Sequence, residues 1–110
     1  MKLLVLVLNK TDILDDLLRD LLATGVRGAT IIDSTGMARA IDIGDVSIFG
    51  SLRMVIDEDR QSSKTLLIAV QDSLVDQVRA TIDNAVGGLS KPDTGVLFGL
   101  PISFFDGKVN

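Results

Sequence analysis

Residues 3–8 read LLVLVL and residues 65–70 read TLLIAV, and these two stretches decide the fold. Both are short, unbroken apolar runs with polar residues nearby in the sequence. A run of this kind predicts a strand that is buried on both faces, because a half-exposed strand would alternate apolar with polar side chains. Each run is followed by a segment with helical periodicity, so we expect two strand–helix units in the chain.

The first helix follows residues 3–8. Thr11 is its expected N-cap, and Gly25 is expected to end it. Its apolar positions recur with helical spacing at Ile13, Leu14, Leu17, Leu18, Leu21 and Leu22. Residues 29–34 are rich in β-branched side chains and predict a second, short strand.

The second helix follows residues 65–70. Ser73 is its expected cap, with Asp76 three residues later as a weak capping box, and Gly87 and Gly88 are expected to stop it. The positions expected to be buried are Val75, Val78, Ile82 and Ala85.

The expected order is β-α-β, an insertion over residues 36–64, and a second β-α-β. Residues 96–105 predict the last strand, in which Gly99 and Pro101 indicate an edge strand or a bulge. Two such units in tandem predict an α+β fold, a ferredoxin-like βαββαβ sandwich with a four-stranded antiparallel sheet. The first and third strands of that fold lie in the middle of the sheet, where continuously apolar strands belong.

The insertion is the part of the chain with the weakest pattern. Residues 49–56 (FGSLRMVI) have helical spacing and predict a short helix, and residues 57–64 (DEDRQSSK) are polar and expected to be exposed. The acidic residues 57–59 have oxygen ligands that suit a hard cation, but a solvated acidic turn is the simpler interpretation. We therefore predict no metal site.

Two helices can cover only one face of a four-stranded sheet. The central strands carry apolar side chains on both faces, so a second layer must bury the other face. Self-association through this open face is one solution. The alternative is that residues 36–64 fold back over it.

Composition excludes several classes of function. The 110 residues suit one domain, and the chain contains no cysteine and no histidine, which removes thiolate sites, the commonest metal ligand and the usual acid–base catalyst. We predict no catalytic residues. Eleven scattered basic residues and a net charge of −4 argue against nucleic-acid binding. The apolar start is too short for a signal peptide, so a cytoplasmic location is expected.

Two segments, GVRGATIIDSTGMAR at 25–39 and VGGLSKPDTGVLFGLPIS at 86–103, together with the strand–helix spacing, resemble the nitrogen regulatory protein PII family, in particular its divergent PII-like branch. The resemblance covers nearly the whole chain. It implies a signal-transduction protein that forms a homotrimer and binds adenine nucleotides or related effectors in the clefts between subunits. The 36–64 segment would then be the loop that meets a partner protein, an enzyme or a membrane transporter.

The resemblance also implies the residues of an effector site. By position in the motifs they are Asp33, Ser34, Gly36, Met37, Arg39, Gly87, Gly88, Lys91 and Gly95. Ala38, Ala40 and Val96 stand where the family has a glycine, a glutamine and a lysine. A triphosphate needs several cations or many convergent N–H groups, so no cofactor is assigned.

In the loop, the resemblance implies partner-binding residues Phe49, Leu52, Arg53 and Met54. For every one of these positions an ordinary structural interpretation stays open. Phe49 and its neighbours suit local packing, the glycines suit a helix stop and a turn, and Arg39 and Lys91 suit solvated surface positions. The alternative function is a trimeric interaction module that binds no ligand.

Overall fold

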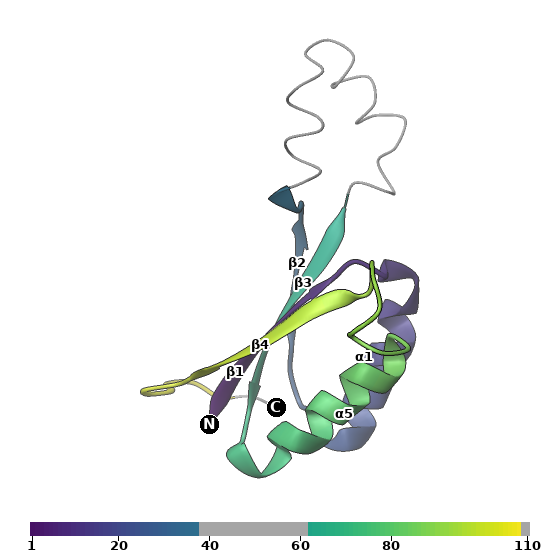
Figure 1. The fold of residues 1–110 in the computed structure, drawn as a ribbon. Coiled ribbons are helices and arrows are strands. Elements are labelled where there is room, and N and C mark those ends of the chain that lie inside the picture. Colours follow the sequence, from purple (N-terminus) through teal and green to yellow (C-terminus); the bar gives the residue numbers. More distant parts are fainter. Residues whose placement is uncertain (38–61, 109–110) are drawn as a thin grey trace.

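The computed structural model describes residues 1–37 and 62–108 (Figure 1). In chain order, the first half contains β1 (Lys2–Leu8), the 3₁₀ turn η1 (Thr11–Ile13), α1 (Leu14–Thr24) and β2 (Thr30–Ser34). The second half contains β3 (Ser63–Val70), the 3₁₀ turn η2 (Asp72–Leu74), α5 (Val75–Ala85) and β4 (Gly95–Pro101). In each half, a strand is therefore followed by a 3₁₀ turn and then by an eleven-residue helix.

The four strands form one sheet in the order β2-β3-β1-β4, and every neighbouring pair is antiparallel. The predicted α+β class and the antiparallel four-stranded sheet are thus confirmed. The two most apolar strands, β1 and β3, lie in the middle, and β4, with Gly99 and Pro101, lies at an edge. This arrangement is compatible with a ferredoxin-like sandwich.

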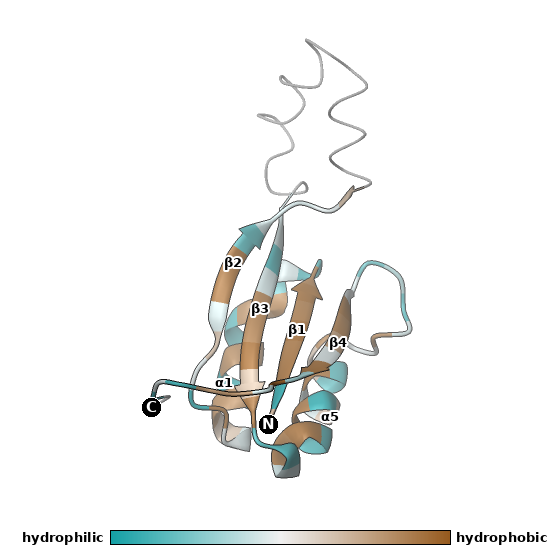
Figure 2. Ribbon diagram, turned by 90° about the vertical axis from the view of Figure 1, so that its left-hand side faces the viewer, coloured by the Kyte–Doolittle hydropathy of each residue, from teal (hydrophilic) through white to brown (hydrophobic). Residues whose placement is uncertain are grey.

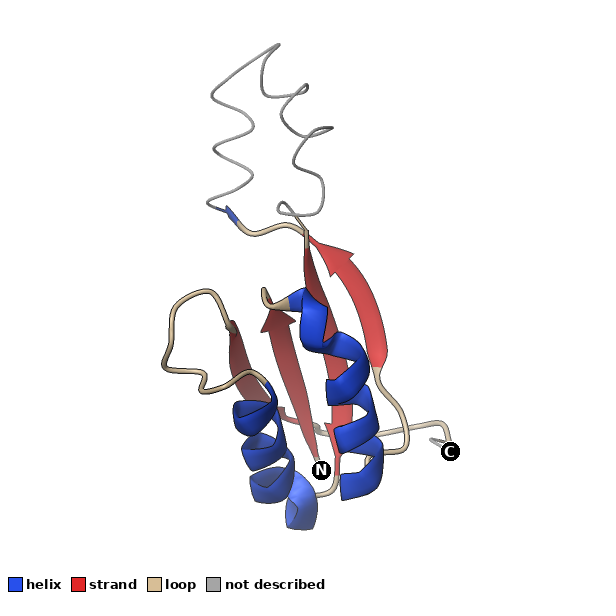
Figure 3. Cartoon of the chain, turned by 90° about the vertical axis from the view of Figure 1, so that its right-hand side faces the viewer, coloured by secondary structure: helices blue, strands red, loops and turns tan. Residues whose placement is uncertain are grey.

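Both helices cover the same face of the sheet, and no helix covers the other face (Figure 2, Figure 3). Alternate residues of the central strands face the helices, so Leu6 is fully buried while its neighbours Val5 and Val7 are only half-buried. The core comprises Leu4, Leu6, Leu8, Leu17, Leu21, Val26, Leu66, Ile68, Val70, Val78, Ile82 and Val86. Each fully buried leucine contributes about 1.5–3 kcal/mol through its removal from water.

The predicted helix caps are wrong, and the 3₁₀ turns are the reason. Thr11 and Ser73 each lie inside a 3₁₀ turn, and no side-chain cap hydrogen bond is made at either helix start. The turn itself satisfies backbone donors, as in the hydrogen bond of 2.9 Å from the Leu74 N–H to the Gln71 carbonyl. Gly25 does end α1, in the left-handed conformation with φ of 113°.

Two other expectations need correction. Leu22 is 61% exposed, because five residues at about 100° each place it about 140° around α1 from the buried Leu17. The last strand ends at Pro101 and does not continue to residue 105. Pro101 pairs with Lys2, which is the first residue of β1, so β4 has no strand partner after Pro101. The Ile102 N–H still donates a hydrogen bond to the Met1 carbonyl. The chain then crosses the sheet near its base on the side away from the helices, where Phe105 and Lys108 line a depression together with Leu3, Leu67 and Ala69 (Figure 2).

Some predictions fall on residues outside the described parts of the chain. They are the short helix over 49–56 and residues 57–61 of the polar segment. The end of that segment is not exposed as predicted, because Ser63 and Lys64 begin β3 and Ser63 is buried. Within residues 1–37 and 62–108, neither helix has the length and apolarity that crossing a bilayer requires.

Candidate functional site

The predicted effector residues fall into two groups at one end of the sheet. Asp33 and Ser34 end β2, with Gly36 and Met37 directly after them, and the other group lies in the loop from α5 to β4, which contains Gly87, Gly88, Lys91 and Gly95. Arg39 and the predicted partner-binding residues Phe49, Leu52, Arg53 and Met54 lie outside the described residues.

One chain does not bring these two groups together. They share an end of the sheet, because Leu8 at the end of β1 pairs with both Lys64 and Gly95, and Asp33 in turn pairs with Lys64. However, β2 and β4 are opposite edges with two strands between them. Three inter-strand spacings separate these edges by about 14 Å. The two groups therefore lie on opposite edges of the single chain.

The loop between α5 and β4 uses its own backbone donors. The Gly87 and Gly88 N–H groups donate to carbonyls of the last helical turn, Asn84 at 3.1 Å and Asp83 at 2.9 Å. The Leu89 N–H donates to the Asp83 carboxylate at 2.8 Å. Positive φ angles of 79° and 111° at the two glycines produce this helix stop. In this conformation the loop does not present these three N–H groups to a phosphate.

Thr94 fixes the far end of the same loop. Its buried hydroxyl donates to the Lys91 carbonyl at 2.9 Å, and its carbonyl accepts from the Asn9 and Lys10 N–H groups at 3.1 and 3.2 Å. The loop is thereby tied to the junction between β1 and α1. Lys91 is exposed, and within residues 1–37 and 62–108 its ammonium group makes no salt bridge, so it is available to an anion.

At the other edge, the polar groups of β2 have partners in β3. Asp33 forms an ion pair with Lys64, and the Ser34 hydroxyl lies 2.7 Å from the Ser63 hydroxyl and 2.8 Å from that of Thr65. These partners could not be predicted from the sequence, because only the register of β2 against β3 shows which side chains are neighbours. Gly36 and Met37 are exposed beyond the end of the strand.

We call the face of the sheet away from the helices the outer sheet face, and the strand register places mainly apolar side chains on it. The strand register places Val5 between Leu67 and Phe98 on this face. Ile32, Val96, Phe98 and Leu100 are between 44% and 58% exposed in the single chain. According to the strand register, the apolar residues of the outer sheet face are Leu3, Val5, Val7, Ile32, Leu67, Ala69, Val96, Phe98 and Leu100.

No family model matches the chain, and a search of curated proteins gives no match either. The resemblance to the PII family therefore stays a hypothesis based on the motifs, and the function must be argued from the geometry. In the described part of the chain, no three acidic side chains gather where they could hold a metal ion.

Gly95 and Gly36, two glycines of the candidate site, differ in whether the structure has room for a side chain at their positions. A Cβ on Gly95 would lie 2.8 Å from the Val7 carbonyl oxygen, whereas a Cβ on Gly36 would meet nothing within 4 Å. We predict that Gly95→Ala lowers the free energy of unfolding by about 1–3 kcal/mol, because the sheet backbone must shift. Gly36→Ala, the matched control, should change it by less than about 0.5 kcal/mol. Urea unfolding followed by circular dichroism measures both, and equal effects would contradict this interpretation of Gly95.

Proposed function

We propose that the protein is a PII-like regulatory homotrimer with a complete ferredoxin-like βαββαβ topology and its insertion between β2 and β3. The observation that carries this proposal is the outer sheet face, which no helix covers. Within the described residues only the C-terminal segment around Phe105 lies against it, beside Leu3, Leu67 and Ala69, and Ile32, Val96, Phe98 and Leu100 stay exposed. An apolar surface that spans four strands is unusual on a monomer and marks an interaction site. A second and third copy of the same face supply the missing layer.

The position of the candidate site supports a ring of copies. The β2 group and the Lys91 loop lie on opposite edges of the sheet. A head-to-tail arrangement brings one edge of each chain against the other edge of its neighbour, and rotation closes it into a ring. Each junction then contains one complete cleft. We propose that this cleft binds a small effector of the adenine nucleotide class.

Regulation requires that the effector distinguishes two states of the protein. Because β2 leads directly into the 36–64 segment, an effector held beside Asp33 and Gly36 contacts the root of that segment. If it binds one arrangement of the segment more tightly, it shifts the population toward that arrangement. A partner enzyme or transporter that recognises only one arrangement is then bound or released.

A second candidate function is a trimeric interaction module that binds no effector. The hydrogen bonds of the α5–β4 loop favour it, because the N–H groups of Gly87, Gly88 and Leu89 already have acceptors within the chain. The ion pair of Asp33 with Lys64 likewise occupies that carboxylate. This module forms the same trimer as the first proposal. The difference is that no effector binds in the cleft.

The trimer is tested by placing a charge on the outer sheet face. Phe98→Asp should convert the trimer to monomers at micromolar concentration, because a buried carboxylate without a partner costs several kcal/mol at each interface. Leu22→Asp is the matched control, since Leu22 is also an exposed apolar residue but lies on α1. Sedimentation velocity measures the species present. A trimer that survives Phe98→Asp, or a loss that Leu22→Asp reproduces, contradicts this interface.

The effector is tested separately, by calorimetric titration with ATP, ADP and AMP. We predict binding to the native trimer that is lost when Arg39 and Lys91 are both replaced by alanine, because these are the basic residues retained at the motif positions. Arg19→Ala, which removes a positive charge from α1, is the control and should bind normally. Binding that persists in the double variant contradicts the site. A native trimer that binds none of the three nucleotides favours the interaction module.

A further inference from the structure

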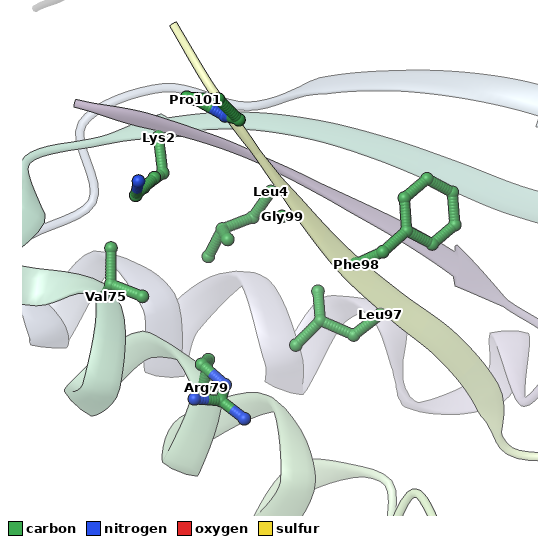
Figure 4. Close-up of a pocket in the computed structure, with 8 residues that line it drawn as sticks. All are labelled: Lys2, Leu4, Val75, Arg79, Leu97, Phe98, Gly99 and Pro101. Carbon is green, nitrogen blue, oxygen red and sulfur yellow. The ribbon is translucent and has the colours of Figure 1, made fainter.

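A cavity of about 280 Å³ lies between edge strand β4 and helix α5 (Figure 4). Its apolar lining includes Leu4, Val75 and Leu97, which belong to three different elements. Gly99 pairs with Leu4 in the sheet, and a Cβ at this position would lie 3.2 Å from the Leu4 Cδ2 atom. The space beside Leu4 is therefore open because residue 99 has no side chain.

Two basic side chains line the same cavity. Lys2 comes from β1, and Arg79 comes from α5, one helical turn after Val75. Figure 4 shows Lys2 beside Pro101 and Arg79 on the helix, with the apolar lining between them. Among the described residues, no aspartate or glutamate lines this cavity.

Neither cation is neutralised by a close partner. The Arg79 Nη1 atom lies 3.9 Å from the Asp76 carboxylate, whose side chain is fully solvated, so this pair contributes little. Lys2 makes no salt bridge within residues 1–37 and 62–108. The cavity thus combines an apolar lining with an excess of positive charge.

The surface beyond Arg79 has the opposite charge. A neighbouring depression along α5 is lined by Asp76 and Asp83 as well as by Arg79 and Leu97. An anionic group is repelled from that end and attracted to the space between Lys2 and Arg79. The charge pattern therefore orients a ligand that has one negative end and one apolar end.

We infer that this cavity binds a small amphipathic monocarboxylate. Its carboxylate lies between Lys2 and Arg79, which both donate charge-assisted hydrogen bonds, and its apolar part lies against Leu4, Val75 and Leu97. A cavity of about 150 Å³ accommodates benzene, so this one has room for an apolar part of about six carbons. Phe98 of the outer sheet face also lines the cavity, but the side chains assigned to the ligand belong neither to that face nor to the cleft at the other end of the sheet.

The test is an amide ¹H–¹⁵N NMR titration of the full chain with hexanoate, and with hexan-1-ol as the uncharged analogue. Hexanoate should give saturable shifts at the amides of Leu4, Val75 and Gly99, and hexan-1-ol should bind about tenfold more weakly, since it lacks the charge-assisted bonds. Shifts that do not saturate, that centre on the outer sheet face, or that are equal for the two compounds overturn the inference.

Variants assign the binding to these side chains. Arg79→Gln and Lys2→Gln should each weaken hexanoate binding about tenfold. Gly99→Ala should weaken it by reducing the space beside Leu4. Arg19→Gln is the matched control, because Arg19 is also an exposed helix residue and pairs with Asp16 at i−3, as Arg79 pairs with Asp76. If Arg79→Gln binds hexanoate as well as Arg19→Gln does, the assignment is wrong.

Discussion

A sheet has two faces, and the two helices of this chain cover only one of them. This constraint links the fold to the proposed assembly. Leu6 and Leu66 are fully buried because α1 and α5 lie over them, while Val5 and Phe98, on the other face, stay partly exposed in the single chain. In the proposed trimer, further copies bury that second face, and the cleft is built from the edges of two neighbouring sheets.

The arrangement of the strands could be predicted because it depends on patterns that extend over whole segments. Continuous apolar runs marked β1 and β3 as central, and Gly99 with Pro101 marked β4 as an edge. The helix starts could not be predicted in the same way. Whether Thr11 caps a helix or enters a 3₁₀ turn depends on the backbone angles of a few residues, which local propensity does not determine. Leu22 was misplaced because the apolar stripe of α1 is wider than the buried face.

The candidate site could be predicted only as two separate segments. The predicted strand order already put β2 and β4 at opposite edges of the sheet, but the motifs indicated Lys91 and Asp33 without showing what surrounds them. The groups that hold these residues in place, Asp83 and Thr94 in the loop and Lys64 in β3, became evident only from the hydrogen bonds and the strand register. The cavity between β4 and α5 gave no sequence signal, since Lys2 and Arg79 are far apart in the chain.

The most direct test of the central claim is native mass spectrometry of the unmodified protein, sprayed gently at several concentrations. Burial of the outer sheet face by copies of the chain predicts a species of three times the 11.7 kDa chain mass, without a population of free monomers at micromolar concentration. A monomer at all concentrations would contradict this account, because the apolar face would then be stable in water or covered by the chain itself.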